Sequence, residues 1–521
     1  MEDVQDKLNL SAKLVNGSLL PLIISLSLSL SFAQSSPPSD DATVESLRFA
    51  EIYGAIQQNA ADEVDPDRMI LDGGIRGMLS ALDPFSAFFD REQFELLRQQ
   101  TRGEAMGFGS ILYVTPGKIL VLQTAQGSPS WRAGLGPGDE IVEINGTRIN
   151  RIDFQSLVEL LRSSRSHPVR LGVIHPGRVV SQNYELNPAE VALPSVDKCF
   201  LLSPGIGFIH LSGFEEKTPQ EVQEAILKLS TPPLKGLIFD LRDNRGGVVD
   251  AAIGVASLFL NPDVLVMTAR GRSAPEKAYR TARASAQFHM PMVMLVNGDT
   301  ASAAEVLAAA LQEHDRAVIA GSPTYGKGVV QSVLPLSEKT GLALTIAQYF
   351  TPSGRSIQRP LPGTALAAPS RELSLAPGSG HFQTDGGRSV SAGGGVTPDV
   401  EIPSHKLDPW LAFLTQTGTF TNYASERLTL HGRVGESFEA DTTVLDDFKE
   451  FLTHAGVRAP EKYWENDQSY LKLKIKAELL NLVFGLSAGE EVETKGDPQV
   501  QAAARLFSRI PTILKSARTK Q

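Results

Sequence analysis

The chain has 521 residues, of which 42% are hydrophobic and 21% charged, and its net charge is −10. This length exceeds what one hydrophobic core usually supports, so we expect about three domains of ordinary globular composition. The acidic balance, with no concentrated basic segment, argues against nucleic acid as a partner, and the single cysteine, Cys199, excludes an intramolecular disulfide and a cysteine-based zinc site.

An apolar run near the N-terminus predicts an export signal. Residues 19–32 read LLPLIISLSLSLSF, a run of 14 residues that is too short to be a convincing transmembrane helix. Ser31 and Ala33 are the small residues that signal peptidase requires before its cleavage site. We expect a signal peptide over 1–33, a linker over 34–43, and an exported protein of the periplasm or cell envelope. Acidic residues ahead of the run keep a cytoplasmic protein with an apolar leader as the alternative.

The next two segments differ in their periodicity. Residues 44–102 carry apolar residues at helical spacing and predict a helical N-terminal module, in which the helix over 68–82 ends at Asp83-Pro84. Residues 103–187 change to short β-type runs with tight-turn signals such as Asn145-Gly146, interrupted by one helix over 153–162. We expect a small strand-rich domain there.

Strands and helices alternate over residues 188–404, which predicts a layered α/β core. Within it, residues 359–393 are rich in Pro, Gly, Ser and Ala and are interpreted as an insertion with little to bury. Residues 405–521 predict a helical C-terminal domain that carries no motif linked to chemistry.

The first candidate for chemistry is Ser302, which lies in TASAAE between a predicted strand and a predicted helix. A helix N-terminus stabilises negative charge, so this position suits a nucleophile and the oxyanion that it forms, to which the N–H of Ala303 could donate. A structural alternative competes, because Ser302 and Glu305 also satisfy the capping-box pattern.

The second candidate is Lys327, in GKGVVQ and 25 residues after Ser302. If the strand predicted over 329–334 extends back to residue 327, Lys327 and Gln331 share one face of it, so the amide could orient the amine. A desolvated lysine has a lowered pKa and can accept a serine proton. The alternatives are a solvated lysine and a phosphate loop over 321–327, but Gly328 replaces the Ser/Thr of that motif and a strand follows where a helix is needed.

The third candidate is the segment DLRDNRGG, residues 240–247, directly after an apolar strand. Gly246 and Gly247 allow close approach of backbone N–H groups to a ligand and could form half of an oxyanion hole, or could be a simple turn. A Ser/His/Asp triad is disfavoured because no histidine lies in a recognisable motif and no GxSxG is present, and the absence of an HExxH motif predicts no metal.

Together DLRDNRGG, TASAAE, TYGKGVVQ, TPSGRSIQ and GVTPD resemble, in order and spacing, the C-terminal processing (tail-specific) peptidases. The resemblance implies a crotonase-like or ClpP-like α/β core with an inserted PDZ domain. It assigns Ser302 as nucleophile, Lys327 as base and Gln331 as the residue that positions the lysine. Thr300 and Ala304 replace serines common in the family, and residues 405–521 lie outside the resemblance.

The resemblance extends upstream, where LDPFS at 82–86 precedes the predicted PDZ domain. Gly107, Phe108 and Gly109 would form its carboxylate-binding loop, which receives the C-terminus of a peptide as an added strand. These features imply a serine endopeptidase without cofactor, acting on proteins with apolar C-termini, and regulated by occupancy of the PDZ domain. A non-catalytic PDZ adaptor is the alternative hypothesis, while membrane proximity and homo-oligomerisation stay open.

Overall fold

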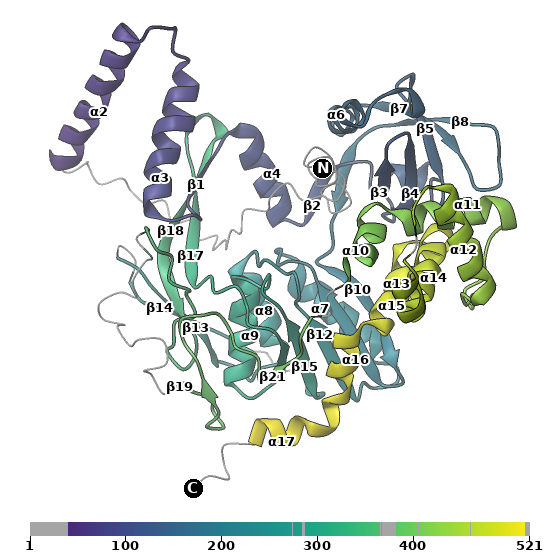
Figure 1. The fold of residues 1–521 in the computed structure, drawn as a ribbon. Coiled ribbons are helices and arrows are strands. Elements are labelled where there is room, and N and C mark those ends of the chain that lie inside the picture. The colour runs from purple at the N-terminus through teal and green to yellow at the C-terminus, as the bar shows by residue number, and fades with distance from the viewer. Residues whose placement is uncertain are drawn as a thin grey trace.

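The computed structural model describes residues 40–272, 275–283, 287–364, 366, 382–404, 407–458 and 460–515. The predicted signal peptide and part of the predicted insertion lie outside these ranges. Within them, no helix is both long and apolar enough to cross a bilayer. Figure 1 shows the chain running from an N-terminal helical hairpin through a small strand-rich domain and a central α/β core to a group of C-terminal helices.

The N-terminal helices project from the body of the molecule (Figure 1). The helix predicted over 68–82 begins with a π-helical segment and ends at Leu82, as the following Asp83-Pro84 pair predicts. The next strand, β1, pairs antiparallel with β18 (Gly341–Phe350) and joins this module to the core. The elements are α2 (Asp40–Asn59), η1 (Arg68–Ile75), α3 (Arg76–Leu82), β1 (Ala87–Phe89) and α4 (Arg91–Thr101).

The predicted PDZ domain is a twisted sheet in the order β3-β4-β5-β7-β8, with β6 paired to β5. Alternate residues such as Ile119, Val121 and Val173 are buried beneath helix α6 together with Leu157. Its elements are β2 (Glu104–Gly107), β3 (Ser110–Thr115), β4 (Lys118–Thr124), α5 (Pro129–Arg132), β5 (Glu140–Ile144), β6 (Thr147–Arg148), η2 (Ile149–Arg151), α6 (Phe154–Ser164), β7 (Val169–Ile174), β8 (Gln182–Leu186) and β9 (Ala189–Ala192).

The core contains a six-stranded sheet in the order β10-β11-β12-β15-β16-β21, in which only β10 runs antiparallel to its neighbour. Strands β12 and β15 are buried along their whole length, as expected of parallel strands covered on both faces. The elements here are β10 (Val196–Ser203), β11 (Ile206–Leu211), α7 (Thr218–Leu229), β12 (Gly236–Asp240), α8 (Val249–Ser257), β15 (Met292–Val296), α9 (Ala303–Glu313), β16 (Val318–Gly321) and β21 (Val400–Glu401).

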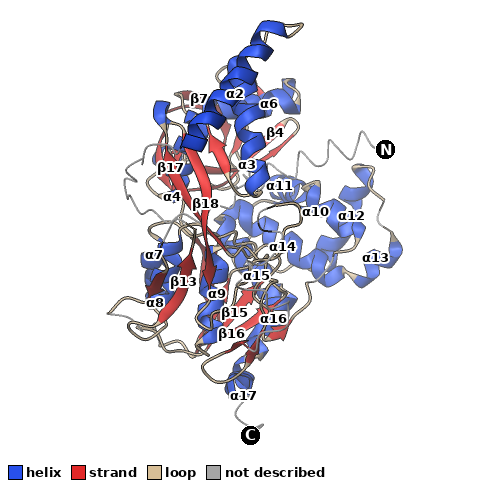
Figure 2. Ribbon diagram, turned by 90° about the vertical axis from the view of Figure 1, so that its left-hand side faces the viewer, coloured by secondary structure: helices blue, strands red, loops and turns tan. Residues whose placement is uncertain are grey.

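A second sheet, in the order β1-β18-β13-β14 with β17 paired to β18, lies beside the first and completes the layered core (Figure 2). A register shift between Val330 and Gln331 interrupts the β17–β18 ladder near the predicted lysine strand. The elements are β13 (Leu265–Arg270), β14 (Lys277–Arg280), β17 (Val329–Pro335), η3 (Ser337–Lys339) and β18 (Gly341–Phe350), and the insertion adds a hairpin of β19 (Phe382–Gln383) and β20 (Ser389–Val390).

The C-terminal helices divide between two partners. Helices α10 to α14 pack against strands β3 and β4 of the predicted PDZ domain in one apolar cluster. Helices α16 and α17 instead cover the face of the six-stranded sheet opposite to α7, α8 and α9, where Val500 and Ala503 meet Ile238 and Val293. The elements are α10 (Pro409–Gln416), α11 (Thr419–His431), α12 (Thr442–His454), α13 (Glu461–Asn466), α14 (Gln468–Phe484), α15 (Leu486–Gly496), α16 (Pro498–Arg505), η5 (Phe507–Arg509) and α17 (Ile510–Lys515).

Candidate active site

Ser302 lies at the turn between β15 and α9 in a strained backbone conformation. Its φ is 57° and its ψ is −120°, a region that residues other than glycine rarely adopt and that is common at functional sites. The side chain is fully buried, and its hydroxyl has no hydrogen-bond partner among the described residues. The serine therefore does not cap the helix with its hydroxyl, so the capping alternative does not account for it.

Lys327 is fully buried immediately before β17. Its ammonium nitrogen donates to Gln331 Oε1 at 2.7 Å and lies 4.7 Å from the centre of the Phe85 ring. Burial lowers the pKa of Lys327 to about 7, although the nearby negative charges of Asp83 and Glu305 oppose this shift. About half of the lysine is thus neutral near neutral pH, which is the state that a general base requires.

Gln331 occupies the place that the sequence predicts, next to the lysine and fully buried. Its Oε1 accepts from Lys327, and its Nε2 donates to the backbone carbonyl of Phe85. Because the amide is held from both ends, the amine of Lys327 has a fixed acceptor. The 82–86 segment, which the sequence linked only to the family resemblance, therefore supplies both the ring and the carbonyl that hold this pair.

Glu305 is a site residue that the sequence reasoning missed. Its Oε2 accepts from the N–H of Ser302 at 2.9 Å and of Lys327 at 2.8 Å, and its Oε1 accepts from Gly326 N at 2.8 Å and from the Thr324 hydroxyl. Burial raises the pKa of this carboxyl above its ordinary value, while these hydrogen bonds oppose the rise. Its position in the capping-box pattern was the only signal for it, and that pattern gives no hint of the loop over 324–327.

This carboxylate fixes the two candidate catalytic residues relative to each other through their backbones. The same contacts argue against a phosphate loop at residues 321–327. The N–H groups of Gly326 and Lys327 donate hydrogen bonds to Glu305 and so are not available to a phosphate, and the lysine side chain is buried. The prediction that this segment is not a nucleotide site is consistent with that geometry.

The glycine segment lies directly against Ser302. A Cβ added to Gly246 would lie 2.8 Å from Ser302 Cβ and 2.9 Å from Ala303 N, and its φ is 94°, so only glycine fits at this position. The N–H of Gly246 donates to Asn244 Oδ1 at 2.9 Å and is already engaged. Of the predicted oxyanion donors, Ala303 is thus better placed than Gly246, because Ala303 opens a helix whose first N–H groups lack internal partners. Gly247 pairs with Phe214 in an isolated bridge.

The predicted carboxylate-binding loop belongs to a different domain and does not join this cluster. Phe108 and Gly109 accept hydrogen bonds through their carbonyls from Ser130 and Ala125, and Gly109 has a φ of 74°. Gly107 ends β2, and the following strand β3 is at the edge of its sheet, where one row of backbone groups can pair with an added peptide.

Other catalytic chemistries find no support near Ser302. Three histidines have carboxylate neighbours, namely His175, His210 and His314, but none bonds the Ser302 hydroxyl. Across the described part of the chain, no group of three His, Cys, Asp or Glu side chains could hold a metal ion.

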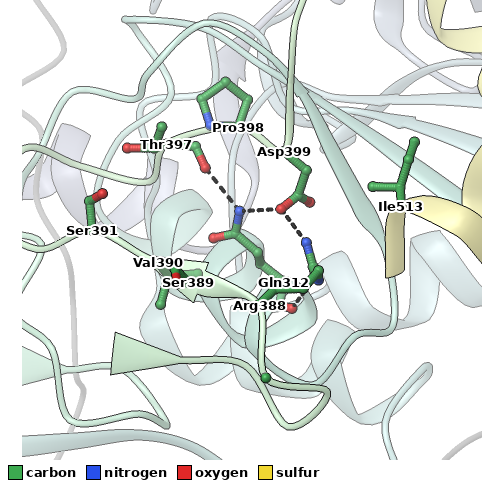
Figure 3. A pocket seen from close by; sticks show the side chains of 10 residues that line it. Gln312, Arg388, Ser389, Val390, Ser391, Thr397, Pro398, Asp399 and Ile513 are labelled. Carbon is green, nitrogen blue, oxygen red and sulfur yellow. Dashed lines mark hydrogen bonds and ion pairs between the residues drawn. The ribbon is translucent and has the colours of Figure 1, made fainter. Parts of the chain in front are cut away.

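A cavity of about 490 Å³ opens at the opposite end of helix α9 from Ser302. Figure 3 shows Gln312, Arg388 and Asp399 on its wall, bonded to one another. The helix has 11 residues, so the cavity lies about 16 Å from Ser302, and its charged groups are paired within the protein. It is not the substrate site.

The family model described as Peptidase family S41 matches residues 205–365, and the PDZ domain model matches residues 120–174. A carboxy-terminal-processing protease of Bartonella bacilliformis is 34% identical over 316 residues, covering 60% of this chain and 72% of the relative. A carboxyl-terminal-processing protease of Synechocystis sp. is 34% identical over 291 residues, covering 55% of this chain and 68% of the relative.

Among solved structures, the photosystem II D1 C-terminal processing protease is similar at 26% identity and a TM-score of 0.37, covering 69% of this chain and 93% of that one. The family models and the observed elements confirm the predicted fold class, a mixed α/β core with an inserted PDZ domain and helical segments at both ends.

Proposed function

The chain belongs to peptidase family S41, with the carboxy-terminal processing proteases, and from that membership we propose that it is a serine endopeptidase using a Ser302–Lys327 dyad. The observation that carries this proposal is the fully buried Lys327, whose pKa of about 7 leaves it able to accept a proton. Because desolvation is the largest cause of this shift, the same burial that removes the lysine from water also makes it a base.

The proposed reaction has two halves. Neutral Lys327 takes the proton of the Ser302 hydroxyl while the serine oxygen bonds to the scissile carbonyl carbon. The resulting oxyanion accepts hydrogen bonds from the N–H groups of Gly247 and Ala303. The lysine ammonium then protonates the leaving amine as the C–N bond breaks, which leaves an acyl-enzyme. Neutral Lys327 then takes a proton from water as the water oxygen bonds to the ester carbonyl carbon. The lysine ammonium returns that proton to the Ser302 oxygen as the ester C–O bond breaks, which releases the carboxylic acid and restores the enzyme.

The dyad is not hydrogen-bonded in this structure, since the Ser302 hydroxyl has no partner among the described residues. We propose that substrate binding aligns it, and that a substrate tail added to β3 of the PDZ domain favours the aligned state. The predicted substrates are exported proteins with apolar C-termini, and the predicted site of action is the periplasm or cell envelope. N-terminal sequencing of the mature protein and cell fractionation test the export proposal, which an uncleaved cytoplasmic protein would contradict.

The dyad is tested with purified protein and an unfolded substrate that ends in apolar residues. The wild type should degrade it, while Ser302→Ala and Lys327→Ala should each be inactive with unchanged circular dichroism. Lys339→Ala, which removes an exposed lysine of η3, is the matched control and should retain full activity. Full activity in either dyad variant would contradict the assignment.

Covalent labelling distinguishes a serine peptidase from a non-catalytic PDZ adaptor on the same fold. A serine-reactive phosphonate should label Ser302 of the wild type and should not label the Ser302→Ala variant. A folded protein that binds apolar peptide tails but neither cleaves them nor reacts with the phosphonate would establish the adaptor instead.

A further inference from the structure

We infer that Asp497 and Gln499, from the C-terminal helices, are positioning residues for the active-site loop 240–247 and act through Arg242. The inference rests on the proposed function, because this loop carries Gly246, which lies against Ser302, and the proposed oxyanion donor Gly247. It assigns a catalytic contribution to the segment after residue 405, for which neither motif nor family resemblance indicated a role.

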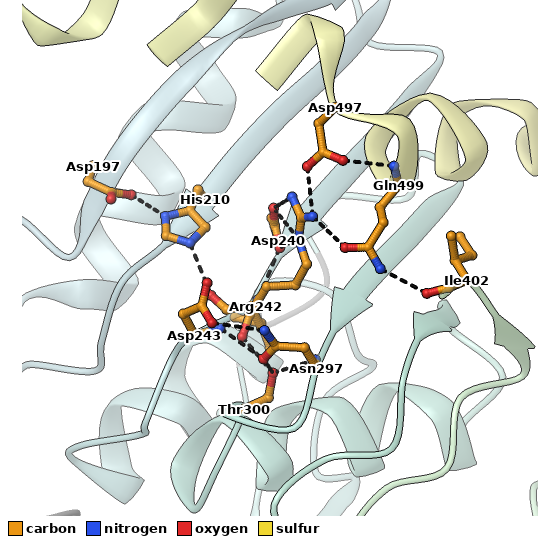
Figure 4. A network of polar contacts seen from close by, with 11 residues as sticks. Asp197, His210, Asp240, Arg242, Asp243, Asn297, Thr300, Ile402, Asp497 and Gln499 are labelled. Atoms are coloured by element: carbon orange, nitrogen blue, oxygen red, sulfur yellow. Dashed lines mark hydrogen bonds and ion pairs between the residues drawn. The ribbon is translucent and has the colours of Figure 1, made fainter. Parts of the chain in front are cut away.

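Two side chains of the C-terminal helices, Asp497 and Gln499, bind the guanidinium of Arg242, and we call this pair the C-terminal clamp (Figure 4). Its Nη1 lies 2.7 Å from Asp497 Oδ2 and donates to Gln499 Oε1 at 2.8 Å. The Gln499 amide also donates to the carbonyl of Ile402 at 2.8 Å, so its acceptor oxygen cannot turn away without breaking a second bond. Arg242 itself is only 17% exposed, which limits screening by solvent.

The same guanidinium is fixed to its own loop. Arg242 Nε and Nη2 bond the carboxylate of Asp240 at 2.9 and 2.6 Å, and Asp240 ends the buried strand β12. His210, which is bonded to Asp197, lies 3.2 Å from the carbonyl of Arg242 through its Nε2. Side chain and backbone of this one arginine are therefore both held, and Asp497 and Gln499 are the contacts that come from outside the core strands.

The other side of the loop is attached to the turn that leads into Ser302. The carbonyl of Leu241 accepts from the Thr300 hydroxyl at 2.7 Å, and the carbonyl of Asn244 accepts from Ala301 N at 2.9 Å. Asp243 exchanges hydrogen bonds with Asn297. These hydrogen bonds connect the loop that carries Arg242 to residues 297–301 and to Gly246 beside Ser302, so we expect a shift of Arg242 to displace both.

The C-terminal segment that carries the C-terminal clamp also contacts the PDZ domain through its earlier helices. The Tyr113 hydroxyl of β3 donates to the carbonyl of Gly418 at 2.9 Å, and Lys118 Nζ of β4 donates to Ser425 Oγ at 2.7 Å. One helical segment therefore contacts both the predicted tail-binding sheet and the loop beside the nucleophile. Loss of the contacts of Asp497 and Gln499 with Arg242 should lower the rate of the chemical step, because the loop beside Ser302 is displaced. Substrate binding should stay largely intact.

The test compares Asp497→Asn with the matched control Glu491→Gln, which breaks the exposed pair of Glu491 with Lys495 on neighbouring α15. Asparagine keeps the oxygen that accepts from Gln499 N at the start of α16, so helix capping is preserved, while the carboxylate oxygen that pairs with Arg242 is replaced by an NH2 group. Two readouts are taken, namely kcat and KM on a fluorogenic peptide, and hydrogen exchange of the peptide covering 241–248. Circular dichroism and the melting temperature show whether each variant is folded.

We expect kcat to fall about 10-fold in Asp497→Asn with KM changed less than about 2-fold, since small displacements of catalytic groups cost up to about 100-fold. Exchange over 241–248 should become faster than in Glu491→Gln, Gln499→Met should show both effects, and Asp497→Glu should recover most of the rate. Kinetics and exchange equal to those of Glu491→Gln overturn the inference. If the wild type does not cleave, the proposed function fails, and the exchange comparison alone decides whether Asp497 holds the loop.

Discussion

The buried lysine predicts the pH dependence of the enzyme. With a pKa of about 7, Lys327 is neutral in about half of the molecules at pH 7, whereas at an ordinary pKa near 10.5 it would be neutral in about one in 3,000. Because the neutral form is the base, kcat/KM should rise about 10-fold per pH unit below pH 7 and level off above it. A fluorogenic peptide assayed from about pH 5 to pH 10 measures this limb.

A single substitution tests the physical cause. Asp83 is buried, and its negative charge raises the pKa of Lys327, so Asp83→Asn should move the acidic limb to lower pH by about half a unit or more. Asparagine retains Oδ1, which accepts the N–H groups of Phe85 and Ser86 at 2.8 Å. Asp90→Asn, which changes an exposed cap of α4, is the matched control. A wild-type limb near pH 10, or identical limbs in the two variants, would refute the reasoning.

Three further substitutions have matched controls or a defined pH trend. Gly246→Ala should lower kcat about 100-fold or more, because its Cβ would be 2.8 Å from Ser302 Cβ, while Gly298→Ala has open space and should be neutral by the same assay. Gly109→Ala should weaken binding of an apolar peptide tail about 10-fold in a fluorescence titration, since its Cβ would be 2.3 Å from Ser128 Cβ, whereas Gly127→Ala has the same positive φ without the clash; equal affinities would contradict the assigned loop. Lys327→Met should be inactive but should raise the free energy of unfolding at pH 7 by roughly 2 kcal/mol, measured by urea titration. Methionine removes the cost of burying the amine, and loss of the hydrogen bond to Gln331 offsets part of that gain. Because folding lowers the pKa of Lys327, the unfolded wild-type chain binds more protons than the folded one between about pH 7 and 10.5. The free energy of unfolding of the wild type should therefore rise with pH over this range, and its difference from that of Lys327→Met should become smaller.

The sequence determined the order of the elements and provided the candidate site residues. Strands β12 and β15 follow from uninterrupted apolar runs, and the end of α3 follows from a proline, because these are local effects of side-chain chemistry on the backbone. The motifs around Ser302, Lys327 and Gln331, with the glycine pair upstream, predicted one site through their resemblance to the family pattern.

Only the tertiary structure decided what surrounds those residues. Burial lowers the pKa of Lys327, and Asp83, which opposes that shift, comes from a turn far away in the sequence together with the Phe85 ring beside the amine. Glu305 keeps its capping-box bond to Ser302 N, and once the loop over 324–327 folds onto it, the same carboxylate joins the proposed nucleophile to the proposed base. The contact of Asp497 with Arg242 joins residues more than 250 positions apart. Long-range packing and burial set such contacts, and no local pattern records them.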